Sequence, residues 1–493
     1  MVDVAEGTGA GVKHYKPAVY LLALLGGLVA HALLPGDPSQ KAVMAVFVVT
    51  VILWVSEALP LAVTAVGAAL FLVLTGATDA KTAFASLGDP VIFLFIGSFM
   101  LARAMETTGL AKRAAFWLIR QKWATGSLRG LLMAIALVAC LLSLFISNTA
   151  TTAMLLPIVK TVLDGLGKLK RDGPESSALL LMTTWAAGIA VGTMVATPPN
   201  MIGVSILREQ GGVDLNFTQF AMFGMPVTVV LILLAWWLLG RGITLTPEDL
   251  AKVRESALAT TKDMGRWSAA ERNTMLAFGV AIFLWVVPGV MESFLSQEHD
   301  VMKWVKARFP ESVAALVGAG LLFLLPAKGT KSGMTFTWDE AKEIDWGTVL
   351  LFAGGIALGS AVFASGLAQM MGEALAGLTG QGNVWLVTFI CMVAAVLLSE
   401  LASNTASATV IVPISIALAQ GAGVNPAAPT IGAILACSLG FMFPVSTPPN
   451  ALVFGTGYVS GRQMMKKGVV FDVVAVLATL FVLWLVLPRM GLV

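Results

Sequence analysis

Two short polar triplets stand out in a chain that is otherwise strongly apolar. The first lies in FISNTATTAMLLPI, as Ser147-Asn148-Thr149, and the second lies in ASNTASATVIVPI, as Ser403-Asn404-Thr405. Aligned from the serine, six of twelve residues are identical. Hydroxyl and amide groups of this kind can cap the free N–H groups of a helix, or donate to a small anion. One such motif could be a structural turn alone, but two matched copies favour a binding role.

A second motif, TPPN, also occurs twice, at 197–200 and 447–450. Proline has no N–H, so carbonyl oxygens in the preceding turn need other partners. A serine also stands four residues before each triplet, at Ser143 and Ser399, on the same helical face. Hydroxyl and carbonyl oxygens suit a hard cation such as sodium, whereas the helix start after each triplet favours an anion. The motifs therefore predict a cation site and an anion site in one structure.

The composition places these motifs in a membrane. Hydrophobic residues make up 57% of the 493 positions and charged residues only 12%, against roughly 25% in a soluble domain. Apolar runs of about 20 residues recur along the chain, so we predict an all-α polytopic membrane protein. The net charge of +3 gives no indication of nucleic-acid binding. The three cysteines lie far apart without CxxC spacing, which argues against a disulfide framework or a cysteine metal site.

The apolar windows predict the positions of the membrane helices. Two long regions, 128–166 and 384–419, are each interrupted by a triplet, and we interpret them as re-entrant hairpins. The other predicted spans are 17–35, 42–57, 60–77, 89–108, 177–207, 219–240, 274–291, 311–326, 347–366, 427–456 and 468–488.

The chain also contains an internal duplication. Gly109 matches Gly366, the triplets match at an offset of 256 residues, and the TPPN motifs match at 250. These matches predict two halves, 1–240 and 274–493, joined by a polar connector, 241–273.

Loop charges give the orientation of the two halves. Residues 109–130 include five basic residues and no acidic one, whereas 366–383 include no basic residue. By the positive-inside rule the first loop is cytoplasmic and the second faces outward, and the N-terminus and connector are then cytoplasmic. Five predicted spans separate the loops, so the second half must run upside down. We therefore predict an inverted repeat, which is typical of secondary transporters.

The chain resembles the divalent anion/sodium symporter family of carboxylate transporters. The resemblance extends over nearly the whole chain and is carried by four segments: SNTATTAMLLPI, SELASNTASATVIVPI, GFMFPVSTPPNALVFGTG and WVSEALPLAVTA. It implies about eleven transmembrane helices and two opposed re-entrant hairpins. It further implies a homodimer in which a transport region slides against a scaffold region, as in an elevator.

The resemblance also implies which residues bind substrate and sodium. Substrate carboxylates would be bound by the two triplets and by a TPPN proline: Ser147, Asn148, Thr149, Ser403, Asn404, Thr405 and Pro448. One sodium ion would be bound by Ser143, Ser147, Asn148 and Ala196. The other would be bound by Ser399, Ala402, Asn404 and Ser446. At Ala196 and Ser446 the ligand would be a backbone oxygen.

Charge balance agrees with these implied sites. Neither hairpin tip contains Lys or Arg, so a dianion would need co-bound sodium ions to supply positive charge. We therefore expect sodium-coupled import of C4 dicarboxylates, such as succinate, malate or fumarate, across a bacterial-type inner membrane. A sodium-independent dicarboxylate exchanger, and a tricarboxylate or sulfate symporter of the same fold, are the alternatives. An anion channel would need a continuous pore, whereas paired hairpin tips and inverted halves fit a closed, alternating site better. No HExxH, GxSxG or Walker A motif indicates an enzyme or an ATP-driven pump.

Four charged residues in or near the predicted spans have a structural interpretation. We expect Glu57 and Glu400 to hydrogen-bond helix or hairpin ends rather than to relay protons or sodium ions. Arg103 and Glu106, spaced i to i+3, should form a local ion pair.

Overall fold

The chain is helical throughout the part that the computed structural model describes. This part comprises residues 16–493 except 125, 166, 168, 242–245, 247, 249–264, 293, 297, 380 and 381. The N-terminal 15 residues and most of the predicted connector therefore lie outside the described residues. Within them, one isolated β-bridge joins Pro326 to Met334, and no strand forms.

Each half of the chain is introduced by a group of helices that does not contain a triplet. In the first half these helices are α2 (Lys16–Leu33), α3 (Pro38–Ser56), α4 (Leu61–Leu74), α5 (Ala80–Ala85) and the 3₁₀ helix η1 (Ser86–Gly88). In the second half they are α14 (Ala269–Met291), α15 (Asp300–Arg308), α16 (Glu311–Leu324) and α17 (Trp338–Ala341).

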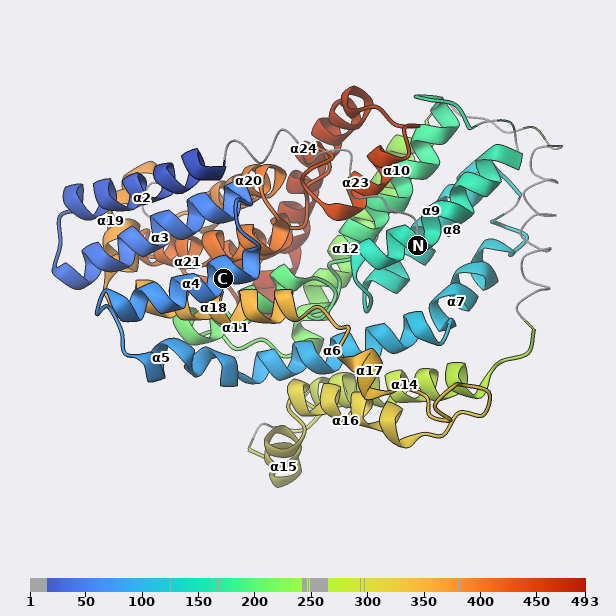
Figure 1. The fold of residues 1–493 in the computed structure, drawn as a ribbon, viewed down its shortest axis with the longest axis horizontal. Helices are drawn as coiled ribbons and strands as arrows, with labels where there is room; N and C mark the ends of the chain where they lie inside the picture. Colours follow the sequence, from blue (N-terminus) through green and yellow to red (C-terminus); the bar gives the residue numbers. More distant parts are fainter. Residues whose placement is uncertain are drawn as a thin grey trace.

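The helices that follow occur in the same order in both halves (Figure 1). The first set is α6 (Pro90–Thr107), α7 (Leu110–Ile119), α8 (Leu128–Ser143), α9 (Asn148–Gly165), α10 (Pro174–Ile189), α11 (Pro198–Gly211) and α12 (Phe217–Leu239). The second set is α18 (Trp346–Ala364), α19 (Leu367–Thr379), α20 (Val384–Leu401), α21 (Asn404–Gly421), α22 (Ala427–Ala436), α23 (Pro448–Gly455), α24 (Gly461–Val486) and the 3₁₀ helix η2 (Leu487–Met490).

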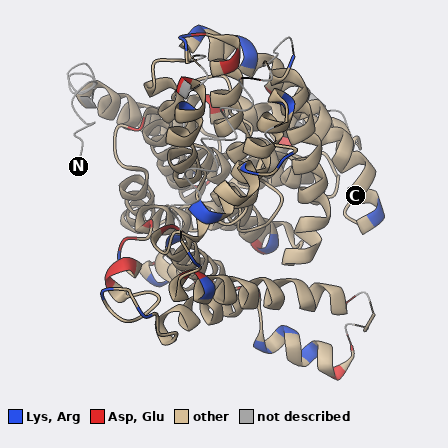
Figure 2. Ribbon diagram, turned by 90° about the vertical axis from the view of Figure 1, so that its right-hand side faces the viewer, with Lys and Arg blue, Asp and Glu red and all other residues tan. Residues whose placement is uncertain are grey.

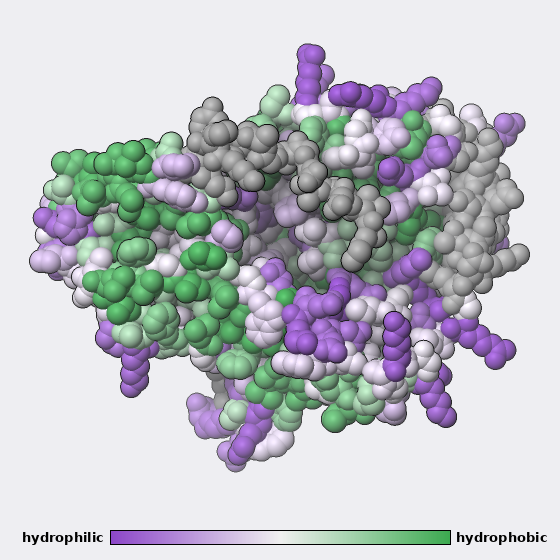
Figure 3. All heavy atoms as spheres, viewed as in Figure 1, coloured by the Kyte–Doolittle hydropathy of each residue, from purple (hydrophilic) through white to green (hydrophobic). Residues whose placement is uncertain are grey.

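The helices confirm a polytopic membrane protein. In the described residues, seven helical stretches are long and apolar enough to cross a membrane, and α15 and α16 form a further candidate bent by 59°. Charged residues concentrate near helix ends, on connecting segments and on α15, and long stretches of helix carry none (Figure 2). Side chains over α2 to α4 form a largely apolar surface, whereas polar side chains gather around α17 (Figure 3). An apolar surface of this extent is suited to contact with lipid.

Two helices occupy segments that we expected to be loops. These are α7 and α19, in 109–130 and 366–383. Helix α7 buries Leu110, Ala115 and Ile119 but also contains two basic residues. An averaged hydropathy window misses such a helix because polar residues on one face offset the apolar residues on the other.

All four predicted interruptions are present, and each divides its region into two helices. The triplets separate α8 from α9 and α20 from α21, whereas TPPN begins α11 and α23. The helices after the triplets start at Asn148 and Asn404, so Ser147 and Ser403 are the residues immediately before the first helical residue. The TPPN prolines stand in the first turn of a new helix, where a missing N–H breaks no helical hydrogen bond.

Matched glycines allow close helix crossings in the two halves. Helix α6 packs on α16, and α18 packs on α4. A Cβ atom added at Gly97 would lie 2.7 Å from the carbonyl carbon of Ala315, and one at Gly354 would lie 2.4 Å from the carbonyl oxygen of Ala65. The glycines are 257 residues apart, the same offset as Gly109 and Gly366. Other contacts are matched as well, with α8 on α10 and α20 on α22, and α9 on α23 and α21 on α11.

We predict that Gly97→Ala and Gly354→Ala each destabilise the protein. The added methyl group would overlap a backbone that cannot move without separating two helices, at a cost of about 1–3 kcal/mol. The measurement is the Tm of detergent-purified protein. Gly320→Ala in α16 is the control, because no atom lies within 4 Å of its added Cβ. Equal Tm values for all three variants would show that the crossings tolerate a side chain.

Candidate functional site

Both triplets and both TPPN motifs lie on one cavity of about 530 Å³. Its lining includes 147–149, 403–405, 197–199 and 447–450, together with Ala196. The first turns of α9, α11, α21 and α23 therefore face the same space. Of the predicted site residues, Ser143, Ser399 and Ala402 are buried and lie outside this lining, whereas all the others form part of it.

At the first tip, two buried side-chain oxygens have no hydrogen-bond partner. Ser147 Oγ caps α9 by accepting a hydrogen bond from the Ala150 N–H at 3.1 Å. Asn148 Oδ1 and Ser143 Oγ are both inaccessible to solvent and unpaired within the described residues. A buried oxygen without a donor is costly, and a cation would satisfy both. The residues present therefore fit a sodium ion.

At the second tip, oxygen atoms gather around Ser399. Its Oγ lies 2.7 Å from Asn404 Oδ1 and 2.6 Å from the carbonyl oxygen of Cys437. The hydroxyl has one proton and can donate to only one of these acceptors. The excess of lone pairs fits a sodium ion here as well. Ser446 Oγ also lies near two carbonyl oxygens, 3.0 Å from Gly440 O and 2.8 Å from Phe443 O, but it accepts a hydrogen bond from Asn450 Nδ2 at 3.0 Å as well. The hydroxyl of Ser446 is therefore already occupied, and its backbone carbonyl is the better candidate ligand.

The asparagine of each TPPN motif stabilises the non-helical segment before it. Asn200 Nδ2 donates to the carbonyl oxygens of Val191 and Thr193, at 3.2 and 2.8 Å. Asn450 Nδ2 lies within 3.2 Å of Gly440 O, Phe443 O and Ser446 Oγ, and Asn450 Oδ1 accepts from Thr184 Oγ1 at 2.7 Å. We assigned these two asparagines no role from sequence. Their identical place after both proline pairs was the available signal.

The carboxylate of Glu400 supports the same region from the side. It accepts hydrogen bonds from the N–H groups of Met442 and Phe443, at 2.7 and 3.1 Å. Structural hydrogen bonding by Glu400 is thereby confirmed. The expectation for Glu57 was wrong. Its side chain is exposed, and its backbone takes the left-handed conformation, with φ 47°, that ends α3.

The four helix starts differ in how they are capped. Ser147 and Thr447 cap α9 and α23, whereas Ser403 and Thr197 form no side-chain cap for α21 and α11. The N–H groups in the first turn of α21 thus remain available to a ligand. Each helix start contributes roughly half a positive charge, so the cavity suits an anion without a lysine or arginine at the tips.

Comparison with known proteins identifies the family. A family model described as the sodium:sulfate symporter transmembrane region matches residues 16–490. The chain belongs to the divalent anion/sodium symporter family. It is 30% identical to the sodium-dependent dicarboxylate transporter SdcS of Staphylococcus saprophyticus, over 97% of this chain and 93% of that protein. It is 29% identical to SdcS of Staphylococcus aureus, over 88% and 84%.

Two solved structures are similar in fold to this family member. The Alcanivorax borkumensis YdaH transporter gives a TM-score of 0.58 at 15% identity and covers 97% of this chain and 98% of its own. Neisseria gonorrhoeae MtrF gives 0.52 at 13% identity, with 94% and 97% covered. These likenesses concern the fold alone. The family is one of membrane transporters, so the protein is a transporter rather than an enzyme.

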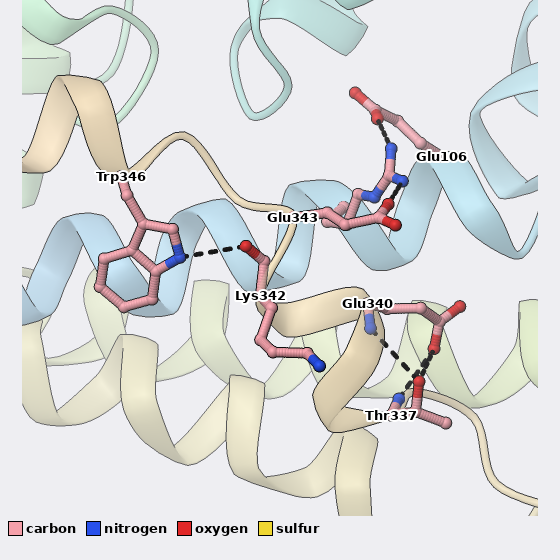
Figure 4. A network of polar contacts seen from close by, with 7 residues as sticks. Glu106, Thr337, Glu340, Lys342, Glu343 and Trp346 are labelled. Carbon is pink, nitrogen blue, oxygen red and sulfur yellow. Dashed lines mark hydrogen bonds and ion pairs between the residues drawn. The ribbon is translucent and has the colours of Figure 1, made fainter.

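The outer part of the family member's cavity contains charged side chains. Arg103 Nη1 lies 3.4 Å from Glu106 Oε2, which confirms the predicted ion pair. Arg103 Nη2 also pairs with Glu343, between α17 and α18, a partner that sequence did not indicate. Figure 4 shows Glu106 and Glu343 pointing toward the same guanidinium group. All three side chains line the cavity, as does Asp345.

We predict that Asn450→Ala lowers both stability and transport. The change removes the amide that donates to the carbonyl oxygens of Gly440 and Phe443 and leaves the buried Thr184 hydroxyl without its acceptor, at a cost of about 1–3 kcal/mol. The measurements are the Tm of purified protein and uptake per folded protein. Asn425→Ala is the control: it removes only the cap that Asn425 Oδ1 provides for the Ala427 N–H. An Asn450→Ala variant as active as this control would mean that the segment keeps its shape without the amide.

Proposed function

We propose that the protein is a sodium-coupled importer of C4 dicarboxylates such as succinate, malate and fumarate. The observation that carries this proposal is the single cavity lined by both triplets and both TPPN helix starts, with unpaired oxygens behind the first tip and crowded oxygens behind the second. The cavity offers donors for an anion and oxygen ligands for cations within one site. The names of the SdcS relatives support the same substrate class and coupling ion.

The two triplets would bind the two ends of the substrate. Amide and hydroxyl donors of Asn148 and Thr149 would hold one carboxylate, and those of Asn404 and Thr405 would hold the other. Ser147, Ser403 and Pro448 line the cavity beside them. The helix starts add positive potential without a fixed cation, so the substrate remains free to dissociate.

The sodium ions would balance the charge of the dianion. We place one at Ser143, Ser147, Asn148 and Ala196, and the other at Ser399, Ala402, Asn404 and Ser446. Because the tip asparagines belong to both the sodium and substrate sets, binding of sodium would favour binding of the anion, and the reverse. A net positive charge carried inward would gain about 2.3 kcal/mol per 100 mV from the membrane potential.

We further infer an inverted repeat that works as an elevator in a homodimer. Matched helix order, matched glycine crossings and matched contacts support the repeat. The cavity runs from buried Asn450 to Glu343, whose side chain is 61% exposed, beside the end of α6 that leads into the basic segment 109–130. This end would face the cytoplasm, with the N-terminus on the same side, in the inner membrane.

We predict that purified protein in liposomes accumulates labelled succinate when a sodium gradient is directed inward. The sodium gradient supplies the free energy for succinate accumulation, because sodium and the substrate dianion would bind at the same cavity and each would favour binding of the other. Uptake is measured with sodium or choline outside. Equal accumulation in choline would support the sodium-independent exchanger instead. Unlabelled citrate and sulfate, added as competitors, test the tricarboxylate and sulfate alternatives.

We also predict that Asn148→Ala and Asn404→Ala reduce succinate uptake at least about 100-fold. Each removes a donor to one carboxylate and an oxygen beside one ion, and interactions with charged groups contribute about 1.5–3 kcal/mol each. Uptake is measured in liposomes, with Tm as the test of folding. Asn425→Ala is the matched control. Normal kinetics in both tip variants would exclude the triplets from the binding site.

A further inference from the structure

One basic side chain lines the cavity in the described part of the chain, and it lies far from the tips in sequence. This is Arg103, on α6; the acidic lining residues are Glu106, Glu343 and Asp345. An anion that enters or leaves at this end must pass three carboxylates. The guanidinium is the one lining side chain that would attract it.

The guanidinium group of Arg103 already contacts two carboxylates, which are the groups that a dicarboxylate substrate would offer it. One nitrogen, Nη1, pairs with Glu106, and the other, Nη2, pairs with Glu343 (Figure 4). The two carboxylates come from α6 and from the segment before α18, 237 positions apart. The third nitrogen of the group, Nε, is buried and has no hydrogen-bond partner among the described residues. Arg103 therefore already binds carboxylates and has a donor in reserve.

The pair with Glu343 is the one that a ligand can replace. The Glu343 side chain is 61% exposed and that of Arg103 is 32% exposed, and exposed ion pairs contribute little to stability. Glu106 stands on the same helix as Arg103, one turn away, so α6 itself keeps the two side chains near each other. An incoming carboxylate of the same chemistry can thus exchange with Glu343 at little cost.

A second polar group on α6 continues the path toward the tips. Ser98 lines the cavity, is 7% exposed, and its Oγ has no hydrogen-bond partner in the described residues. It lies five residues before Arg103, about 7.5 Å along the helix axis. Phe99 and Ala102 line the same stretch.

We propose that Arg103 is a docking site for substrate carboxylate at the mouth of the cavity, and that Glu343 is an internal competitor that occupies it between transport events. The site would take carboxylates of small dianions and pass them along α6 to the triplets. This proposal rests on the proposed transport of dicarboxylates and adds a residue outside the central site. The guanidinium group of Arg103 has a planar fork of N–H donors, which matches a carboxylate better than the ammonium group of a lysine would.

The test compares Glu343→Gln with Glu340→Gln. Glu343→Gln frees Arg103, so the half-saturating succinate concentration should fall by about threefold, the size expected for an exposed ion pair. Glu340→Gln removes the same charge three residues away. Its side chain bonds Thr337 and does not line the cavity, so this variant should behave as wild type. Sodium-driven succinate transport is measured in membrane vesicles of both orientations, and the change is expected only for substrate at the cytoplasmic face.

Arg103→Gln should raise the half-saturating concentration by about tenfold, the loss of one charge-assisted contact. In the double variant Arg103→Gln/Glu343→Gln, the second change should have no further effect. A gain of affinity by Glu343→Gln cannot come from misfolding, which keeps the test decisive.

Three outcomes would overturn the docking site. They are an equal effect of Glu340→Gln, an effect of Glu343→Gln that persists without Arg103, and an equal change at both membrane faces. Each would mean that Glu343 acts through general charge or global conformation. Failure of the proposed function is distinguishable, because wild-type vesicles would then show no sodium-driven succinate transport at all.

Discussion

The structure depends on one constraint: a helix that stops inside the membrane leaves backbone groups that must find partners there. Four helices begin around the central cavity, and each leaves N–H groups at its start. Carbonyl oxygens are likewise released in the segments before the two TPPN motifs. Such breaks are stable only where side chains or ligands satisfy the free groups. The cavity is therefore a consequence of these helices beginning inside the membrane.

Part of this demand is met by the protein itself. Asn200 and Asn450 donate to released carbonyl oxygens, and Glu400 accepts from released N–H groups. These hydrogen bonds hold the non-helical backbone before α11 and α23 in place where water does not serve as its hydrogen-bond partner. At the two tips, by contrast, the oxygen atoms of Asn148 and those around Ser399 are not fully satisfied by protein donors. The groups left for ions and substrate are thus a small set held in place by saturated neighbours.

In the proposed mechanism, the central site and the mouth would use different chemistry for the same anion. At the tips, helix starts and neutral donors supply a diffuse positive potential, and the proposed sodium ions would be the mobile part of the charge. At the mouth, Arg103 supplies a fixed charge that Glu106 and Glu343 neutralise. A fixed cation beside the tips would bind substrate without sodium and weaken coupling. A paired cation at the mouth would leave the central site dependent on sodium.

The sequence alone determined the membrane class, the long spans, the four helix breaks and the residues at the tips, because apolar runs and Ser, Asn, Thr and Pro have strong local preferences. It also carried the family resemblance. Only the tertiary structure decided that the breaks share one cavity, that Asn450 donates to the carbonyl oxygens of Gly440 and Phe443 before α23, and that Glu343 reaches Arg103. Amphipathic α7 and α19 were missed because one face of each is polar. Contacts between residues hundreds of positions apart depend on how helices pack, and no local pattern encodes them.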